Sequence, residues 1–367
     1  MPDFNDTIWQ YYNEYFLTEP ALMDLFYNVS AERGDENDEM MSEIQGIVDL
    51  TKLPYEFIKA MQLLEEITAT IMAPIVNGSS LKQNKDGSMI ATTYPKGYEA
   101  LSKLPVSHYG QCTGIIAMNS NDGMVYHSRN FDNSPVDLFQ YLVYEASFQS
   151  GGVEIFKAQM MAGYTMVITG VNGLGTSNGY ALERNTRFVT TIDQFHEVYH
   201  NLYNGRELQG WTYRTTLLNI NNYDDAVSLL SGDDLYCSTE FTILSGVKKG
   251  CILSQSPQGL AHKMTLGDAN NFEQPVSYII MTNFDYYWHD IREFFDPTGG
   301  GGLQNHGPTR RIAAQTILNN TDVITPQVLY EVMNSPYVIA DTVWQGIISV
   351  EANLWNTSIP DYYEPSN

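Results

Sequence analysis

A cysteine at the start of a predicted β-strand is the residue in this sequence best suited to nucleophilic chemistry. Cys112 begins the segment Cys-Thr-Gly-Ile-Ile-Ala-Met, directly after a polar connector, and Tyr-His-Ser-Arg-Asn-Phe-Asp follows at 126–132. If the peptide bond between Gln111 and Cys112 were cut, Cys112 would carry both a thiol and a free α-amine. Such an amine has an ordinary pKa of about 8, so it accepts the thiol proton when a neighbouring cation lowers that pKa.

Two charged residues of the second segment are the predicted partners of this amine and thiol. The turn signal at 119–123 ends in Gly123 and indicates a hairpin. Its second strand brings Arg129 and Asp132 back beside Cys112, where Arg129 lowers the pKa of the amine and Asp132 orients it. These spacings alone do not establish cleavage. The alternative is a buried strand cysteine beside a structural ion pair.

A second motif, His196-Glu-Val-Tyr-His200, matches the pattern in which two histidines on one helical face bind zinc and Glu197 acts as general base. Tyr203 and Arg206 stand where the extended motif has glycine and a third histidine. The apolar stripe of this segment is Phe195, Val198, Tyr199 and Leu202. We therefore expect an amphipathic helix packed on a sheet, with a zinc peptidase as the less favoured alternative, and we expect no cofactor.

Several motifs, taken in chain order, resemble those of acid ceramidase and N-acylethanolamine-hydrolysing acid amidase, a family of N-terminal-nucleophile cysteine hydrolases. Cys-Thr-x-Ile-(Ile/Val)-Ala at 112–117 and His-x-Arg-Asn-x-Asp at 127–132 resemble the start of the family's mature β-subunit. Later segments in the family's order are Phe156-Lys-Ala, Ala162-Gly-Tyr, Thr169-Gly, Leu182-Glu-Arg184, Lys249-Gly-Cys-Ile252, Met281-Thr-Asn-Phe-Asp285 with Trp288, and Thr309-Arg-Arg311. The departures are Gly114 for the usual serine, Ser128 for glycine, and residues 296–309 in place of a compact acidic segment.

The resemblance implies an α+β fold, a four-layer αββα sandwich with a helical N-terminal subunit. It assigns Cys112 as the nucleophile freed by autoproteolysis, with Arg129 and Asp132 tuning its amine and thiol. Asn283 then completes an oxyanion hole as a neutral donor. Glu183 and Arg310 are implied as charged residues of the same site.

The implied activity is hydrolysis of the amide bond of N-acylated lipids, of the ceramide or N-acylethanolamine class, through a thioester. The implied location is lysosomal or secreted, although the first residues show no signal peptide. A catalytically silent lipid-binding relative is the alternative function.

Hydrophobic periodicity divides the chain at Cys112. Residues 1–111 show helical patterns at 8–27 and 41–72, the second interrupted by Pro54, and then a polar connector. Residues 112–367 alternate groups of short strands with groups of helices. We therefore predict a helical α-subunit of residues 1–111 that stays bound to a catalytic β-subunit of residues 112–367.

The composition limits the possible partners. The chain has 367 residues, with 19 Lys and Arg against 43 Asp and Glu, and a formal net charge of −24, which argues against nucleic acid. Because the isoelectric point is near 4.4, this charge falls toward zero in an acidic compartment, where repulsion from anionic lipid largely vanishes and transient contact with a membrane surface is allowed. The longest apolar run, 67–76, is too short to span a bilayer.

Overall fold

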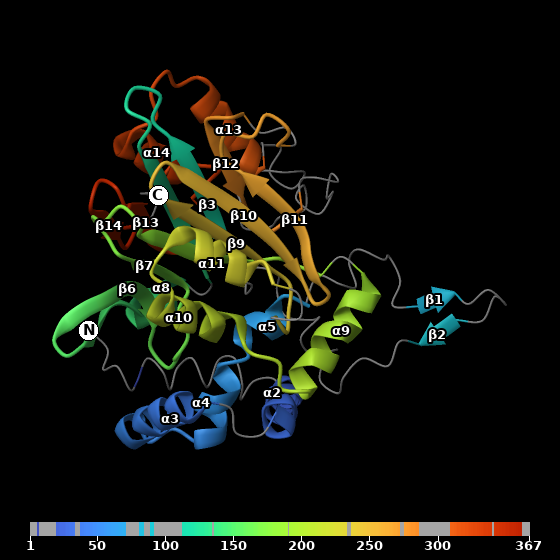
Figure 1. Cartoon of the computed structure of the whole chain (residues 1–367). Coiled ribbons are helices and arrows are strands. Elements are labelled where there is room, and N and C mark those ends of the chain that lie inside the picture. The colour runs from blue at the N-terminus through green and yellow to red at the C-terminus, as the bar shows by residue number, and fades with distance from the viewer. Residues whose placement is uncertain are drawn as a thin grey trace, which may run out of the picture.

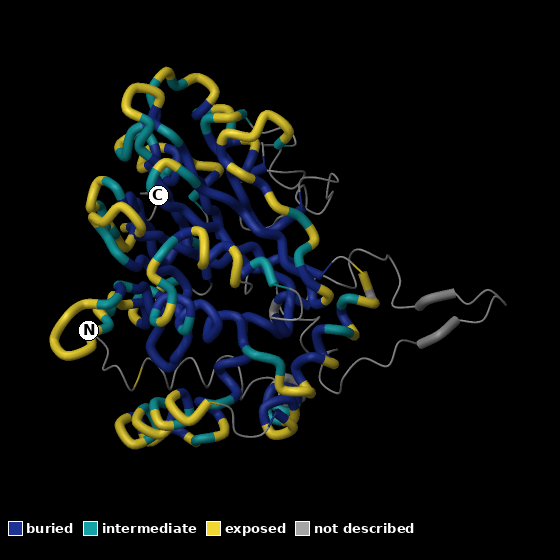
Figure 2. Tube along the Cα trace, in the orientation of Figure 1, coloured by how far each residue is buried: buried dark blue, intermediate teal, exposed yellow. Residues whose placement is uncertain are grey.

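Two antiparallel β-sheets stacked face to face form the centre of the molecule, with helices on both outer faces (Figure 1). The structure is a computed structural model that describes residues 6, 20–33, 37–70, 81–83, 89–91, 112–133, 136–189, 191–232, 236–271, 275–285, 309–339 and 341–361. The central strands of both sheets are buried, whereas three of the four edge strands and the turns carry exposed residues (Figure 2). The predicted four-layer αββα sandwich is confirmed.

The larger sheet is an antiparallel meander of seven strands in the order β11-β10-β9-β8-β7-β6-β5. Its strands are β5 Val143–Ser150, β6 Val153–Met161, β7 Thr169–Asn172, β8 Tyr180–Thr186, β9 Glu240–Gly246, β10 Lys249–Ser256 and β11 Gly259–Thr265. Helices α10 (Gln209–Asn219) and α11 (Tyr223–Leu230) pack on its outer face. They bury an apolar cluster that includes Leu182, Leu217 and Leu244.

The smaller sheet has the order β12-β3-β4-β13-β14. Its strands are β3 Cys112–Met118, β4 Val125–Asp132, β12 Tyr278–Met281, β13 Thr342–Ser349 and β14 Leu354–Ser358. Helices α13 (Arg310–Asn319) and α14 (Pro326–Met333) cover its outer face. Thr309 and Thr325 cap them by accepting hydrogen bonds from the backbone N–H of the third helical residue.

The β3–β4 hairpin decides which side chains face the space between the sheets. The turn ends at Gly123, which has a φ of 73°, and the predicted hairpin is confirmed. The register pairs Cys112 with Phe131, Gly114 with Arg129, and Ile116 with His127. Ile116 packs against side chains of the larger sheet, so these alternate positions face inward.

The described part of the N-terminal segment is helical, as predicted, whereas residues 8–19 and 71–72 of the predicted helical patterns lie outside the described residues. It forms α2 (Pro20–Arg33), α3 (Asp38–Thr51), α4 (Tyr55–Met61) and α5 (Leu64–Thr68), and Pro54 separates α3 from α4. These helices lie at one end of the sandwich near α9 (Ile192–Tyr203), and α8 (Val136–Leu142) precedes β5 (Figure 1). Their apolar side chains share one buried cluster with Cys112 and Phe131. The helices between residues 20 and 68 thus contribute to the core that surrounds the predicted nucleophile.

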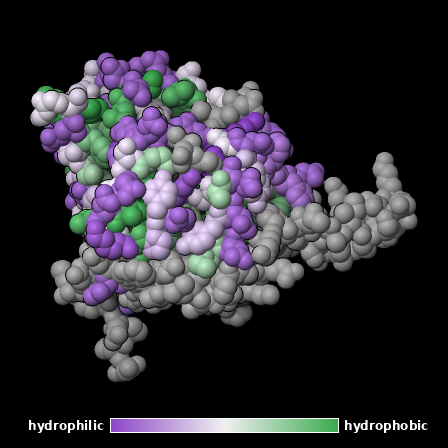
Figure 3. All heavy atoms as spheres, turned by 90° about the horizontal axis from the view of Figure 1, so that it is seen from below, coloured by the Kyte–Doolittle hydropathy of each residue, from purple (hydrophilic) through white to green (hydrophobic). Residues whose placement is uncertain are grey.

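The connector before Cys112 contains one feature that the sequence analysis does not predict. Strands β1 (Leu81–Gln83) and β2 (Met89–Ala91) pair into a short two-stranded sheet that projects from the body in Figure 1. The predicted cleavage position lies outside the described residues on its Gln111 side. Within the described ranges, no helix combines the length and apolarity needed to cross a bilayer. On the face seen in Figure 3, apolar side chains occur in small patches between hydrophilic ones.

Three buried carboxylates from two parts of the chain surround a single guanidinium where α5 meets the larger sheet. Arg184 Nη2 donates to Glu240 Oε2 at 2.8 Å and lies 4.0 Å from Glu65 Oε2. Glu65 also accepts a hydrogen bond from Thr186 Oγ1 at 3.0 Å. Glu66 accepts one from the backbone N–H of Gln209 at 3.0 Å. Burial of Glu66 and Glu240 beside this one guanidinium favours proton uptake by these two carboxylates.

This cluster predicts that the protein is most stable in acid. Burial raises the pKa of Glu240 to about 8 against the attraction of Arg184, and burial also raises the pKa of Glu66. The stabilisation that comes from protonated Glu240 is complete at a pH below 4.5, the ordinary pKa of a glutamate. It is lost as the pH rises through about 8. We expect the free energy of unfolding to fall by on the order of 4 kcal/mol between about pH 5 and about pH 9, as measured by urea denaturation.

The Glu240→Gln variant should flatten this pH dependence, because it replaces the titrating group by a neutral one. The exposed Glu331 provides a matched control, and Glu331→Gln should keep the slope of the native chain. A Glu240→Gln protein with an unchanged slope would contradict this account.

Candidate active site

The structure brings all six predicted site residues into one buried cluster. They come from β3 and β4 (Cys112, Arg129, Asp132), β8 (Glu183), the segment after β12 (Asn283) and the first residue of α13 (Arg310). None of these residues is more than 3% exposed. The cluster therefore joins four segments that lie up to 198 positions apart in the chain.

Cys112 has a polar partner for each of its three functional groups. Its backbone N–H donates to Asn283 Oδ1 at 2.9 Å, and its carbonyl oxygen accepts from Arg310 Nη1 at 2.8 Å. Arg129 Nη2 lies 3.3 Å from the Cys112 sulfur. The backbone on both sides of the α-carbon and the thiol are thus held by different residues.

The amide of Asn283 is fixed in one orientation. Its Oδ1 also accepts from Arg310 Nη2 at 2.9 Å, while its Nδ2 donates to the Thr186 carbonyl oxygen at 2.8 Å. The amide oxygen therefore faces the backbone nitrogen of Cys112. This acceptor role toward the backbone N–H of Cys112 is additional to the donor role that the family resemblance implies.

Arg129 and Asp132 have different ionic partners. Asp132 Oδ2 lies 3.4 Å from Arg310 Nη1, and its Oδ1 accepts from Thr342 Oγ1 at 2.5 Å. Arg129 Nη1 lies 3.6 Å from Glu183 Oε2 and donates to the Arg184 carbonyl oxygen at 2.7 Å. Each charge at the site therefore has its own counter-charge on a separate element.

Burial dominates the acid–base behaviour of the thiol. Desolvation raises the pKa of Cys112 to about 12, and the guanidinium of Arg129 opposes this rise. The carboxylates of Asp132 and Glu65 raise the pKa further, whereas a backbone hydrogen bond with Asp132 lowers it. A thiol in this environment stays protonated at neutral pH, so it needs a base close by to become a nucleophile.

Sequence reasoning missed several residues that support the cluster. Asn185 Oδ1 accepts from Arg129 at 3.3 Å, Thr113 Oγ1 accepts from Arg310 at 3.0 Å, and Thr342 holds Asp132. Thr113 lies within the quoted motif, next to the cysteine. Strand pairing places Thr342 beside Asp132, and stacking of the two sheets places Asn185 of β8 beside Arg129, so no local pattern signals either residue.

The segment of residues 296–309, which departs from the family pattern, leads directly to Arg310. Residues 296–308 lie outside the described residues, and Thr309 caps α13. Arg310 nevertheless reaches Cys112, Asn283 and Asp132 from the start of that helix.

The alternative zinc motif lies on α9. His196 and His200 are exposed, and the four apolar residues of the stripe, Phe195, Val198, Tyr199 and Leu202, are buried. In the described part of the chain, no group of three His, Cys, Asp or Glu side chains is placed to hold a metal ion. The helix thus packs through the predicted apolar stripe.

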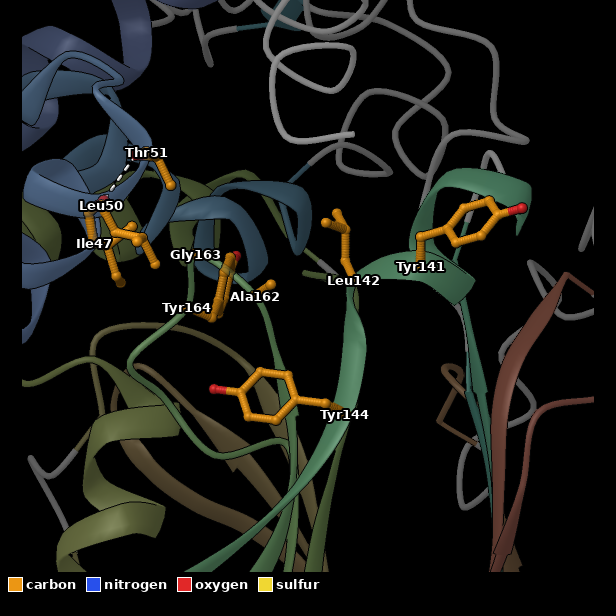
Figure 4. A pocket seen from close by; sticks show the side chains of 9 residues that line it. All are labelled: Ile47, Leu50, Thr51, Tyr141, Leu142, Tyr144, Ala162, Gly163 and Tyr164. Carbon is orange, nitrogen blue, oxygen red and sulfur yellow. Dashed lines mark hydrogen bonds between the residues drawn. The ribbon is translucent and has the colours of Figure 1, made fainter. Parts of the chain in front are cut away.

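An apolar pocket of 380 Å³ opens between the N-terminal helices and the larger sheet (Figure 4). Its lining comes from α3, α8, β5 and the segment after β6: Ile47, Leu50, Thr51, Tyr141, Leu142, Tyr144, Ala162, Gly163 and Tyr164. Leu142, Ala162 and Tyr164 belong to the same apolar cluster as Cys112. Leu50, Tyr141 and Tyr144 are exposed at its rim.

Known proteins with similar sequences are acid ceramidases. The chain is 24% identical over 305 residues to acid ceramidase of Balaenoptera acutorostrata scammoni, covering 77% of this chain and 71% of the relative. It is 25% identical over 301 residues to human acid ceramidase, covering 74% of this chain and 70% of the relative. No model of a known protein family matches the sequence.

A solved structure shares the fold. The Caenorhabditis elegans N-acylethanolamine-hydrolyzing acid amidase ortholog superposes with a TM-score of 0.55 at 24% identity, over 68% of this chain and all of that one. The predicted family resemblance is confirmed by these relatives. In sequence and in its two-sheet fold, the chain thus resembles the acid ceramidases and the N-acylethanolamine-hydrolysing acid amidases.

Proposed function

We propose that this protein hydrolyses the amide bond of N-acylated lipids with Cys112 as an N-terminal nucleophile, after cleaving its own chain between Gln111 and Cys112. The relatives are by name a ceramidase and an amidase, and the chain is a hydrolase of linear amide bonds. The observation that supports the proposed nucleophile is the separate polar partner for the nitrogen, the sulfur and the carbonyl oxygen of Cys112.

Self-cleavage starts from the thiol and the preceding peptide bond. The Cys112 sulfur attacks the carbonyl carbon of Gln111, the thiol proton passes to the backbone nitrogen of Cys112, the C–N bond breaks, and that nitrogen leaves as the new α-amine. Water then hydrolyses the thioester, which leaves a carboxylate on Gln111 and a free thiol on Cys112. Asn283 Oδ1 already accepts from that nitrogen at 2.9 Å and therefore holds the leaving group in place.

Turnover uses the same atoms on a second substrate. The liberated amine accepts the thiol proton, and the thiolate, stabilised by Arg129, attacks the acyl carbonyl of the lipid. The ammonium then protonates the leaving amine, and water releases the fatty acid from the thioester. This mechanism lets the buried thiol lose its proton despite its high pKa, because the α-amine that accepts the proton belongs to the same residue.

The apolar pocket supports a lipid substrate. Its buried wall is continuous with the cluster around Cys112, and its exposed rim of Leu50, Tyr141 and Tyr144 presents apolar groups to the outside. Such a pocket suits an acyl chain that enters from a membrane surface. The protons taken up by the cluster around Arg184 fit a protein that works in an acidic lysosomal or extracellular space.

The first prediction concerns processing. The native chain should give two fragments, 111 residues of about 12 kDa and 256 residues of about 29 kDa, out of 41.4 kDa. Cys112→Ala should remain a single chain without amidase activity, because it lacks the attacking sulfur. A denaturing gel and mass spectrometry of the new amino terminus check both points.

Cys237→Ala is the matched control, since Cys237 is also a buried free cysteine. It should be cut and active like the native chain. An intact native chain that binds lipid without hydrolysing it would identify the catalytically silent alternative. A new terminus at any residue other than Cys112 would contradict the proposed nucleophile.

The second prediction concerns Asn283. Asn283→Ala removes the acceptor of the Cys112 nitrogen and a donor at the site, so kcat should fall about 100-fold, or roughly 3 kcal/mol of transition-state stabilisation. Steady-state kinetics on a processed sample would measure this effect. Asn319→Ala, which removes an asparagine contact to Tyr278 outside the cluster, serves as the control and should keep kcat within about threefold of the native value.

The third prediction concerns the acyl chain. Ala162→Trp should fill the pocket and raise KM for long-chain substrates at least tenfold, with a smaller effect on short-chain ones. A series of N-acyl substrates that differ only in chain length measures this difference. Equal effects on all chain lengths would show that the pocket does not receive the acyl chain.

A further inference from the structure

A buried line of polar side chains connects Arg129 to the larger sheet. Ser245 Oγ on β9 lies 3.0 Å from His127 Nδ1, and His127 Nε2 lies 3.1 Å from Glu183 Oε2. The same carboxylate oxygen lies 3.6 Å from Arg129 Nη1. His127, Arg129 and Glu183 are fully buried, so water does not screen these charges.

Glu183 fits beside the hairpin because residue 114 has no side chain. A Cβ atom at Gly114 would lie 1.9 Å from Glu183 Oε1 and 2.4 Å from Ile243 Cδ1. Gly114 also pairs directly with Arg129 in the β3–β4 register. The carboxylate therefore occupies the space of a missing side chain, two residues from the thiol.

Two groups share this one carboxylate. Among the described residues, neither oxygen of Glu183 accepts a hydrogen bond of good geometry. The contact with His127 Nε2 has the distance of a hydrogen bond but not its angle, so both contacts of Glu183 are electrostatic. The more the carboxylate interacts with His127, the less it neutralises Arg129, whose Nη2 lies 3.3 Å from the Cys112 sulfur.

We propose that His127 is a positioning residue of this site, oriented by Ser245, which acts through Glu183 to set how strongly Arg129 stabilises the thiolate of Cys112. This role rests on the proposed function only in taking Cys112 as the nucleophile. His127 itself contacts the carboxylate and the serine hydroxyl, and it acts on the sulfur through two intervening side chains.

Several charged groups lie near His127 and Cys112, and an experiment must separate their effects on the thiol. His127 faces Glu183 from β8 and Ser245 from β9. The thiol interacts with Arg129 and Asp132 of β4 and with Glu65 of α5. Only the contribution of Arg129 passes through the carboxylate that His127 shares.

The test is the pH profile for alkylation of Cys112 by iodoacetamide, followed by mass spectrometry of the Cys112 peptide in the purified protein. His127→Leu leaves Glu183 with Arg129 alone, so the midpoint should rise by about one pH unit. Below the midpoint this corresponds to an approximately tenfold lower kcat, with KM unchanged. His127→Gln should restore a midpoint close to the native one, because its side-chain amide N–H presents a partial positive charge to Glu183 in place of the imidazole Nε2–H.

Ser245→Ala should shift the midpoint in the same direction as His127→Leu, but less. Ser254→Ala removes a buried serine from the neighbouring strand β10 and is the matched control, with an unchanged profile expected. Because Ser245→Ala changes a single hydroxyl, it also tests the role if His127→Leu does not fold.

A double-mutant cycle tests whether His127 acts on the Cys112 thiol through Glu183. Glu183→Gln removes the charge that neutralises Arg129 and should lower the midpoint, and neither His127→Leu nor Ser245→Ala should change it further in that background. The proposal is overturned if both variants have the native midpoint, or if their shifts are equal with and without the Glu183 charge. A native protein that lacks amidase activity would refute the proposed function while leaving this alkylation result intact.

Discussion

The guanidinium of Arg129 beside the buried thiol of Cys112 is the interaction on which the rest of the site depends. Burial between two sheets raises the pKa of the thiol, and the charge of Arg129 opposes that rise. A guanidinium in such a place is itself costly to bury unless it has acceptors and a counter-charge. The Arg184 carbonyl, the Asn185 amide and the Glu183 carboxylate supply them from a single strand of the opposite sheet.

The αββα arrangement explains why these groups can meet. Alternation along β3 and β4 points Cys112 and Arg129 toward the larger sheet, while Thr113 and Asp132 point toward α13. The first residue of α13, Arg310, then reaches Cys112 from the outer side. Cys112 is thus held from both faces of its own sheet, which keeps its nitrogen and sulfur in fixed positions.

The N-terminal helices are part of the same core and explain how a cut chain would stay together. Their apolar side chains pack in the cluster that contains Cys112, and Glu65 and Glu66 reach polar groups on the catalytic part. A three-carboxylate cluster at this junction links the association to acid, since proton uptake removes excess negative charge. Such a junction suits an acidic setting, as does the sequence-wide net charge of −24.

The sequence by itself determined the local features: the hairpin with Gly123 at its turn, the helices that start after Thr309 and Thr325, and the apolar stripe of α9. Its ordered motifs also indicated the resemblance to acid ceramidases and acid amidases. Periodicity, turn chemistry and capping depend on neighbours within a few residues, so they can be read along the chain. The tertiary structure alone decided that the amide oxygen of Asn283 faces the Cys112 nitrogen, that Asp132 pairs with Arg310, and that Glu183 lies over Gly114 beside His127. These contacts join residues tens to hundreds of positions apart, and sheet stacking sets them through register and side-chain packing, which no local pattern encodes.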